Sequence, residues 1–289
     1  MFPFRRSRKK QIARIEIRGA IASGTRKRVL ECLKEVEERK FPALLLRLDT
    51  PGGTVGDSYE IYTTLMRLRK QCKIVASFGN ISASGGVFIG VAAQHIVANP
   101  GTITGSIGVI LRGNNLEGLL EKVGVSFKVI KSGPYKDILA FDRELTSPEQ
   151  AILQELIDVS YGQFVQVVAE GRNLPVETVQ SFADGRIFTG EQAVKLGLVD
   201  RLGTEEDARR WVAELAGLDP DKATVFNFEE PKSLLSRVTG NQVSQPSRHH
   251  SSTMVAPFLS PLLPAMQTTL DWLEFELETQ GMPLWLYRP

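Results

Sequence analysis

Apolar residues along the first eighty positions recur at two spacings, and this pattern predicts helices and strands in turn. Residues 25–40 place Val29, Leu33 and Val36 on one face, as an amphipathic helix does, and residues 55–70 repeat the spacing. Short apolar runs separate these helices, which is typical of strands covered on both faces. The predicted strands are residues 12–17, 43–48 and 73–78. Strands and helices alternating at this length predict a parallel sheet with right-handed crossovers.

The next part of the chain continues the α/β pattern with one long helix and several shorter ones. A strand is predicted near residues 126–131, and a long helix after it. Ser147 suits the N-cap of that helix, Pro148 its first helical position, and Gln150 completes a capping box. Shorter helices are predicted near residues 175–182, 190–196 and 205–215.

The composition changes after about residue 229. Residues 230–257 are rich in Ser, Pro, Gln, Asn and His, which is typical of a flexible linker. Residues 264–278 then place four apolar side chains on one helical face. The other face is acidic and would be repelled by anionic lipid, so packing on the body or on a neighbouring subunit is favoured over a membrane surface. We therefore divide the chain into a basic arm, a main domain, a flexible linker and an amphipathic tail, at residues 1–11, 12–228, 229–257 and 258–289.

Charge is distributed unevenly over the 289 residues. The net charge is +2, from 35 Lys and Arg against 33 Asp and Glu, yet the first ten positions hold five basic residues and no acid. The remainder is slightly acidic, which argues against a nucleic-acid binder. The basic start is either a solvated arm, which we prefer, or a tether to anionic lipid worth about 1 kcal/mol per basic residue. No apolar segment follows it as in a cleavable signal peptide.

Residues 74–111 contain no Asp, Glu, Lys or Arg. Gly, Ser, Asn and Pro interrupt this stretch throughout, whereas a membrane span needs about 20 mainly apolar residues. The stretch therefore predicts buried strands joined by tight turns that hold a site, and we expect no transmembrane segment.

Two cysteines and three histidines limit the chemistry that the chain can perform. Cys32 and Cys72 cannot form a disulfide framework and are predicted to be buried thiols in a reducing compartment. Nothing clusters them with histidine, so we expect neither a metal nor another cofactor. His249 and His250 lie in the predicted linker, so a Ser-His-Asp enzyme would have to use His95.

Three loops at predicted strand ends carry candidate chemistry. Residues 49–55 contain Pro-Gly-Gly before a helix, where free N–H groups form an anion or oxyanion site. Residues 80–86 place a serine before two glycines, as in a nucleophile elbow. Residues 131–137 contain lysines, and a desolvated lysine can act as a base. Each loop alone could be a simple turn, a phosphate site or a solvated surface. Together, in this order on an α/β pattern, the three loops form a strong and specific signal.

These loops, with residues 99–109, 184–190 and 197–200, resemble peptidase family S49, which comprises signal peptide peptidase A and its single-unit relatives. The resemblance covers residues 12–216. It implies an α/β fold of the ClpP/crotonase-like type, with repeated β-β-α units, a mainly parallel sheet and, here, a flexible C-terminal extension.

The resemblance also implies the roles of five residues. Ser84 would be the nucleophile and Lys136 the general base, while Ser106 would hydrogen-bond the lysine and orient it. The N–H groups of Gly53 and Gly85 would form the oxyanion hole. The acyl-enzyme formed by Ser84 would then be hydrolysed by water.

Two other residues compete with this assignment. Ser82 is a second candidate nucleophile, ranked below Ser84 because no glycine follows it. His95 falls where the resembling families have a strand, so we expect a structural role. ClpP uses a histidine farther downstream of its serine, and this chain has none there, which favours a Ser-Lys dyad.

The sequence departs from the family pattern at two points. Val87-Phe88 follows the elbow glycines, where many relatives have an aromatic pair, and we expect an altered substrate pocket. The N-terminal transmembrane helix common among relatives is not found. We accordingly expect a location in the cytoplasm or at the cytoplasmic face of a bacterial-type membrane, with room for peripheral membrane contact.

The leading hypothesis is a serine endopeptidase that hydrolyses small apolar peptides, such as signal-peptide remnants. The resemblance implies a homo-oligomeric ring or dome, such as an octamer. The alternatives are a crotonase-like acyl-CoA enzyme on the same fold and a catalytically silent scaffold that binds peptides or partners through its C-terminal helix. A further hypothesis is that the linker carries the apolar segment 258–261 to an active site, of its own or of a neighbouring subunit.

Overall fold

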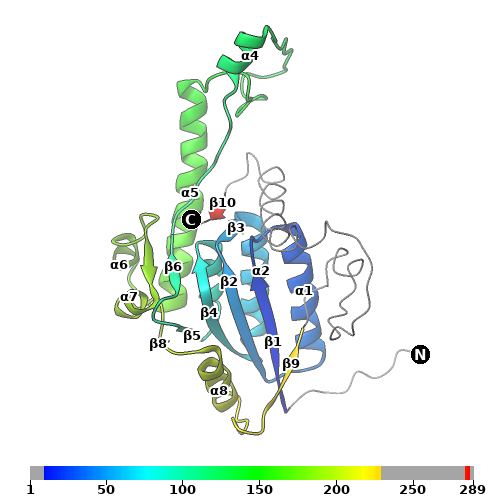
Figure 1. Cartoon of the computed structure of the whole chain (residues 1–289), viewed down its shortest axis with the longest axis vertical. Helices are drawn as coiled ribbons and strands as arrows, with labels where there is room; N and C mark the ends of the chain where they lie inside the picture. The colour runs from blue at the N-terminus through cyan, green and yellow to red at the C-terminus, as the bar shows by residue number, and fades with distance from the viewer. Residues whose placement is uncertain (1–9, 229–283, 287–289) are drawn as a thin grey trace, which may run out of the picture. The chain divides into compact units, whose positions relative to one another are not determined.

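The computed structural model describes residues 10–228 and 284–286 (Figure 1). One eight-stranded sheet organises these residues, and its pairs are parallel except β6 with β7. Its strands are β1 (Gln11–Arg18), β2 (Ala43–Thr50), β4 (Lys73–Ala83), β5 (His95–Ala98), β6 (Ile103–Gly105), β7 (Ile187–Thr189), β8 (Arg201–Leu202) and β9 (Thr224–Asn227). The order along the sheet is β7-β6-β4-β2-β1-β9, and β5 pairs with both β4 and β8.

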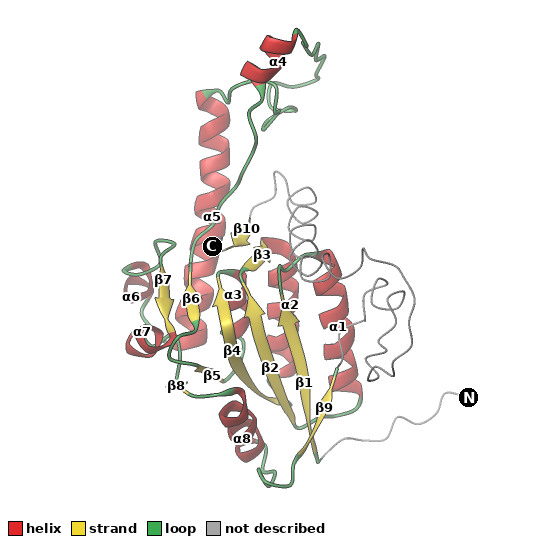
Figure 2. Ribbon diagram, in the orientation of Figure 1, coloured by secondary structure: helices red, strands yellow, loops and turns green. Residues whose placement is uncertain are grey.

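The helices follow the predicted alternation with the strands (Figure 2). They are α1 (Ser23–Glu38), α2 (Val55–Leu68), α3 (Gly85–Gly90), α4 (Glu117–Val123), α5 (Ser147–Arg172), α6 (Val176–Gln180), α7 (Gly190–Lys195) and α8 (Glu205–Leu215). The α/β class, the β-β-α units and the mainly parallel sheet are therefore confirmed. No helix in the described part of the chain is long and apolar enough to cross a membrane.

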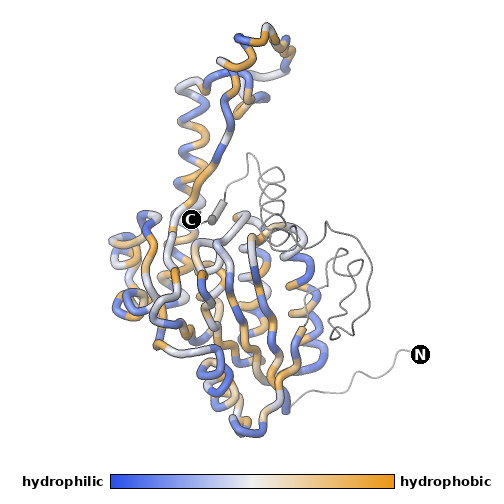
Figure 3. Tube along the Cα trace, in the orientation of Figure 1, coloured by the Kyte–Doolittle hydropathy of each residue, from blue (hydrophilic) through white to orange (hydrophobic). Residues whose placement is uncertain are grey.

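Both faces of the central strands are covered, which explains their nearly continuous apolar runs. On β2, Leu44, Leu46 and Leu48 belong to the large core shared with α1 and α2, whereas Ala43 and Leu45 belong to a smaller core with α8. In Figure 3 these strands carry orange, apolar segments interrupted by blue and white ones. Side chains that alternate along a strand thus fill two separate cores.

Strand β4 is the element that positions the site. Its first half pairs with β2 and β5, and its end pairs with β6, with Ala83 opposite Gly105. The sequence predicted this strand to end at Phe78, but it continues to Ala83. The extension follows from pairing with β6, which local hydropathy does not reveal.

A projecting arm consists of residues 110–146 with the first turns of α5 (Figure 1). The strand predicted at residues 126–131 is wrong: this segment lies in the arm, pairs with no described strand and is exposed. An apolar stretch forms a strand only where a neighbouring strand accepts its hydrogen bonds. The predicted cap of α5 is also displaced by one residue, since Thr146 is the N-cap and Glu149 completes the capping box.

The predictions for the linker at residues 229–257, the helix at 264–278 and the segment 258–261 lie outside the described residues. Within the predicted tail, residues 284–286 form strand β10, which pairs with the short strand β3 (Gly52–Thr54).

Candidate active site

Ser84 occupies a sharp turn between β4 and α3. Its backbone has φ 52° and ψ −115°, in a region that serine rarely adopts. The turn is held by the Ser84 N–H, which donates to the Gly105 carbonyl at 2.8 Å, and by the Phe88 N–H, which donates to the Ser84 carbonyl at 3.0 Å. A serine held in a strained conformation where a strand turns into a helix is the geometry of a nucleophile elbow.

The two glycines after Ser84 are required by close packing against residues 50–58. A Cβ on Gly85 would lie 2.9 Å from Ser58 Oγ and 3.2 Å from the Gly53 nitrogen. A Cβ on Gly86 would lie 2.9 Å from Thr50 Cγ2. Gly85 is also the first residue of α3, so its N–H has no acceptor within the helix. The N–H groups of Gly53 and Gly85 are therefore neighbours.

Strand β3 is fixed by Ile21 on one edge. The Ile21 N–H donates to the Gly52 carbonyl at 2.8 Å, and the Thr54 N–H donates to the Ile21 carbonyl at 2.9 Å. A Cβ on Gly53 would lie 1.9 Å from that carbonyl oxygen. Because successive residues of a strand direct their backbone groups to opposite edges, the Gly53 N–H faces away from Ile21.

Ser106 leaves β6 beside the point where Ser84 leaves β4, because Ala83 and Gly105 are register partners. Its φ is also positive, at 51°, and its N–H donates to the Arg186 carbonyl at 2.7 Å. A cleft of about 650 Å³ opens beside Ser106, and Val109, Tyr161 and Asp184 contribute to its lining. The two serines thus lie on adjacent turns at one end of the sheet.

The Ser84 hydroxyl is fully buried and has no hydrogen-bond partner among the described residues. The hydroxyls of Ser82 and Ser58 are also buried and also have no hydrogen-bond partner among the described residues. A buried hydroxyl without a hydrogen-bond partner is uncommon in folded proteins.

Lys136 lies in the arm, between α4 and α5, and its side chain is exposed. It forms no hydrogen bond with Ser84, whose hydroxyl has no described partner. The next residue, Asp137, is fixed by Lys131 Nζ at 2.6 Å and by Arg143 Nη2 at 3.0 Å. The single chain therefore brings Ser84, Ser106, Gly53 and Gly85 together and leaves Lys136 outside this group.

Arg143 also binds the buried carboxylate of Glu149 at 2.5 Å, at the first turn of α5. Hydrogen bonds from Arg143 are the main cause that lowers the pKa of Asp137 and the pKa of Glu149, each to about 2. Both carboxylates are therefore ionised at neutral pH, and the loop that carries Lys136 is tied to α5.

Comparisons with known proteins now decide the family. Residues 66–219, more than half of the chain, match the model of peptidase family S49. The chain belongs to peptidase family S49. It is 65% identical over 288 residues to a protein of Synechocystis sp. named as a candidate protease, slr0021, with all of both chains covered.

One further relative agrees with this membership, and one solved structure shares the fold. The S49 chain is 35% identical over 254 residues to a protein of Enterococcus faecium named as a candidate signal peptide peptidase SppA, covering 82% of this chain and 72% of that one. A serine-to-alanine mutant of the membrane-bound stomatin-specific protease 1510-N matches its structure with a TM-score of 0.53 at 15% identity, covering 77% of this chain and 99% of that one. The structural likeness supports the fold, and the sequence likeness supports a peptidase.

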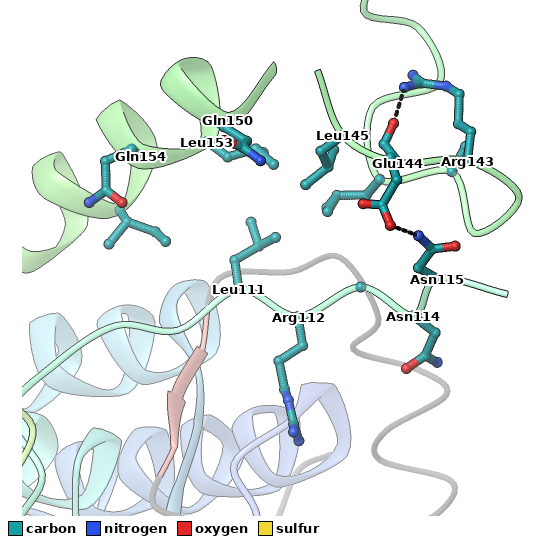
Figure 4. A pocket seen from close by; sticks show the side chains of 14 residues that line it. Leu111, Arg112, Asn114, Asn115, Arg143, Glu144, Leu145, Gln150, Leu153 and Gln154 are labelled. Atoms are coloured by element: carbon teal, nitrogen blue, oxygen red, sulfur yellow. Dashed lines mark hydrogen bonds between the residues drawn. The ribbon is translucent and has the colours of Figure 1, made fainter. Parts of the chain in front are cut away.

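A second cleft, of about 550 Å³, lies in the arm of this S49 peptidase (Figure 4). Leu111 and Asn115 line one side, and Leu145 and Leu153 line the other. The Asn115 amide donates to the Glu144 carboxylate at 2.5 Å beside the cleft. No residue of the Ser84 turn lines this cleft.

His95 and the cysteines lie apart from the Ser84 turn. His95 begins β5, as expected, and its ring stacks on Trp211 with centroids 4.2 Å apart. Cys72 is buried, and burial raises its pKa to about 12, so it stays a thiol; Cys32 is half-buried. Across residues 10–228, no group of His, Cys, Asp and Glu is placed to hold a metal ion.

Ser58 is the residue of this site that the sequence did not single out. It lies on α2, four residues after the Pro-Gly-Gly-Thr segment, and its hydroxyl contacts the space that a Gly85 side chain would fill. The one signal that could have found it is its position on the helix face that otherwise carries apolar residues.

We predict that Gly53→Ala displaces β3 and that Gly56→Ala does not. The Gly53 Cβ would overlap the Ile21 carbonyl, whereas a Cβ on Gly56 meets nothing within 4 Å. Gly56→Ala should hold or raise stability, by up to about 1 kcal/mol, because alanine favours helix. Amide exchange measured by mass spectrometry should quicken at residues 19–23 and 50–58 in Gly53→Ala alone. Equal exchange in both variants would contradict the close approach.

Proposed function

We propose that this S49 peptidase is a serine endopeptidase with Ser84 as nucleophile and Lys136 as general base. The proposal rests on the strained turn at Ser84, whose buried hydroxyl has no described partner, and on the close approach of the next residue, Gly85, to Gly53. Donors fixed before reaction stabilise a developing oxyanion without reorganisation.

The chemistry follows from these positions. Neutral Lys136 accepts the Ser84 proton as Oγ attacks the scissile carbonyl carbon, and the carbonyl oxygen takes the negative charge facing the two N–H groups. Collapse of this intermediate breaks the C–N bond, and the lysine returns the proton to the leaving amine. Water, deprotonated by the same lysine, then hydrolyses the ester and restores Ser84. Ser106, on the adjacent turn, would orient the lysine.

A homo-oligomer would supply the base from a neighbouring subunit. Lys136 is exposed and does not reach Ser84 in one chain. The surrounding arm exposes large apolar side chains, which usually mark a protein interface. They are Leu116, Leu119, Val123, Val125, Phe127, Val129, Ile130, Tyr135 and Phe141. A heterologous contact that passes each arm to the next subunit closes into a ring, and an octamer is one such assembly.

Apolar peptides such as signal-peptide remnants are the substrates that this proposal favours. The cleft beside Ser106 includes Val109, Ile110 and Tyr161, and the Enterococcus relative is named as a signal peptide peptidase. An acyl-CoA enzyme would also use backbone oxyanion donors, but it would leave the Ser84 elbow without a role. A silent scaffold would not require a strained serine. Action in the cytoplasm or at the cytoplasmic membrane face stays a prediction.

Ser84→Ala should abolish both casein cleavage and labelling by a fluorophosphonate probe, with a loss of at least about a thousandfold in rate. Ser82→Ala is the matched control, because Ser82 is equally buried and its hydroxyl is equally partnerless. It should retain labelling and most of the cleavage rate. Labelling that survives in Ser84→Ala would contradict the assignment of Ser84 as nucleophile.

Mixing Ser84→Ala with Lys136→Ala tests where the base comes from. If each site takes Ser84 from one subunit and Lys136 from another, random reassembly of an equal mixture restores roughly a quarter of the sites. We expect this recovery in peptide cleavage after the two variants are dissociated and reassembled together. No recovery in assemblies of native size would mean that one subunit supplies both residues.

Cleavage should also rise from neutral towards alkaline pH, because only the neutral amine of Lys136 accepts the serine proton. The measurement is kcat/KM for one peptide between pH 7 and pH 10 in a constant-ionic-strength buffer, with folding checked at each point by circular dichroism. A flat profile over this range would count against a lysine base.

A further inference from the structure

Asp137, the residue after Lys136, belongs to a cluster of four charges in the arm. Its Oδ1 accepts hydrogen bonds from Lys131 Nζ at 2.6 Å and from Arg143 Nη2 at 3.0 Å, and its Oδ2 accepts one from Arg143 Nε at 3.3 Å. Arg143 also donates to the two carboxylate oxygens of Glu149, from Nη1 at 2.9 Å and from Nη2 at 2.5 Å. Two cations and two carboxylates therefore face one another, and the cluster has no net charge.

Lys136 stands outside this cluster. It lies in the turn of residues 134–139, where its N–H donates to the Gly133 carbonyl at 3.3 Å, and its side chain is exposed. Across residues 10–228 and 284–286, no titratable side chain forms an ion pair or a hydrogen bond with the Lys136 amine. Its nearest titratable neighbours in the sequence outside the cluster are Tyr135, Asp142 and Glu144.

The two lysines of residues 131–137 therefore have different surroundings. Lys131 Nζ donates to the Asp137 carboxylate and, at 3.1 Å, to the Pro134 carbonyl, so its side chain closes the loop from one end to the other. The amine of Lys136 has no such acceptor in the described chain. Lys131 is the counter-ion of Asp137, and Lys136 is the lysine left over.

An unoccupied Asp137 carboxylate would compete for Lys136. Successive Cα atoms are about 3.8 Å apart, so the long lysine side chain could reach it. A carboxylate paired with an ammonium group favours the protonated lysine, which cannot accept a proton from serine. Hydrogen bonds from Arg143, and then from Lys131, lower the pKa of Asp137 to about 2, so Asp137 is negatively charged throughout the neutral and alkaline range. Its charge has to be balanced by some cation.

We propose that Lys131 and Arg143 occupy the Asp137 carboxylate and thereby leave Lys136 unpaired and able to accept a proton. The consequence for catalysis rests on the proposed function, in which Lys136 is the general base. Lys131 and Arg143 act on that base through Asp137, so we assign them a positioning role. All four side chains belong to one chain, and the effect is therefore the same whichever subunit supplies Ser84.

Acetylation of the Lys136 amine tests the proposal without any catalytic step, because acetic anhydride reacts with the neutral amine only. Trace labelling of full-length Ser84→Ala chains, read by mass spectrometry between pH 7 and pH 11, gives the pH at which half of the Lys136 amine is reactive. Lys131→Met and Arg143→Gln each remove one cation from Asp137. We expect each to move this midpoint towards alkaline pH by about half a pH unit, the size of effect that an exposed ion pair has.

Lys128→Met is the matched control. Lys128 is exposed in the same arm and forms no ion pair among the described residues, so its removal changes the net charge equally and should leave the midpoint in place. Arg143→Gln also removes the partner of the buried Glu149 and could loosen α5. Lys131→Met leaves that contact intact, and it therefore decides the test if Arg143→Gln does not fold.

Adding Asp137→Asn to Lys131→Met separates an electrostatic role from a merely structural one. The double variant lacks the released carboxylate, so its midpoint should return to that of the parent chain. A loop that had only lost its tie would not recover. An unchanged midpoint in Lys131→Met, or a displacement that persists in the double variant, would overturn the proposal.

Cleavage by the same variants with Ser84 restored is scored separately. We expect the rise of kcat/KM with pH to move in the same direction and by the same amount as the labelling midpoint. If the labelling midpoints move as expected while Lys136→Ala cleaves peptide at the full rate, the assignment of the base is wrong and the charge cluster stands.

Discussion

The site depends on backbone approaching backbone with no side chain between. Ile21, β3 and the turn after Ser84 come from three separate parts of the chain, and glycine occupies each point of contact. A Cβ on Gly53 would lie 1.9 Å from the Ile21 carbonyl, and one on Gly85 would lie 3.2 Å from the Gly53 nitrogen. This closeness places the two N–H groups beside one another. The proposed oxyanion hole would thus result from glycine packing rather than from any polar side chain.

The same packing holds a conformation that serine resists. A positive φ outside the usual regions costs about 1–3 kcal/mol, and buried contacts of α3 oppose this cost. Phe88 is fully buried, and its ring lies 5.0 Å from that of Tyr62 and 5.3 Å from that of Phe164. Burial of such a side chain contributes about 1.5–3 kcal/mol. The long helix α5 therefore stabilises the Ser84 turn through its aromatic contact with α3.

The sheet and its helices were predictable because the two signals that mark them, apolar spacing and turn residues, are local in the sequence. Apolar spacing gave β1, β2 and α1 to within two residues at each end, and glycine with serine at strand ends marked the turns at Gly53 and Ser84. The continuation of β4 to Ala83 was not predictable, because it depends on pairing with β6. The expected strand at residues 126–131 failed for the converse reason, since its β-like composition has no neighbour to pair with.

The surroundings of Lys136 and the pairing of β10 could not be predicted from local sequence patterns. Motif resemblance identified the lysine, but no spacing states which surface its side chain meets. The loop that carries it is tied through Asp137 and Arg143 to Glu149 of α5. The sheet positions the turns of Ser84 and Gly53, while Lys136 and β10 belong to segments outside it. Whether Ser84 and Lys136 of one site would come from one subunit or from two depends on assembly. The order of residues along a single chain does not encode that assembly.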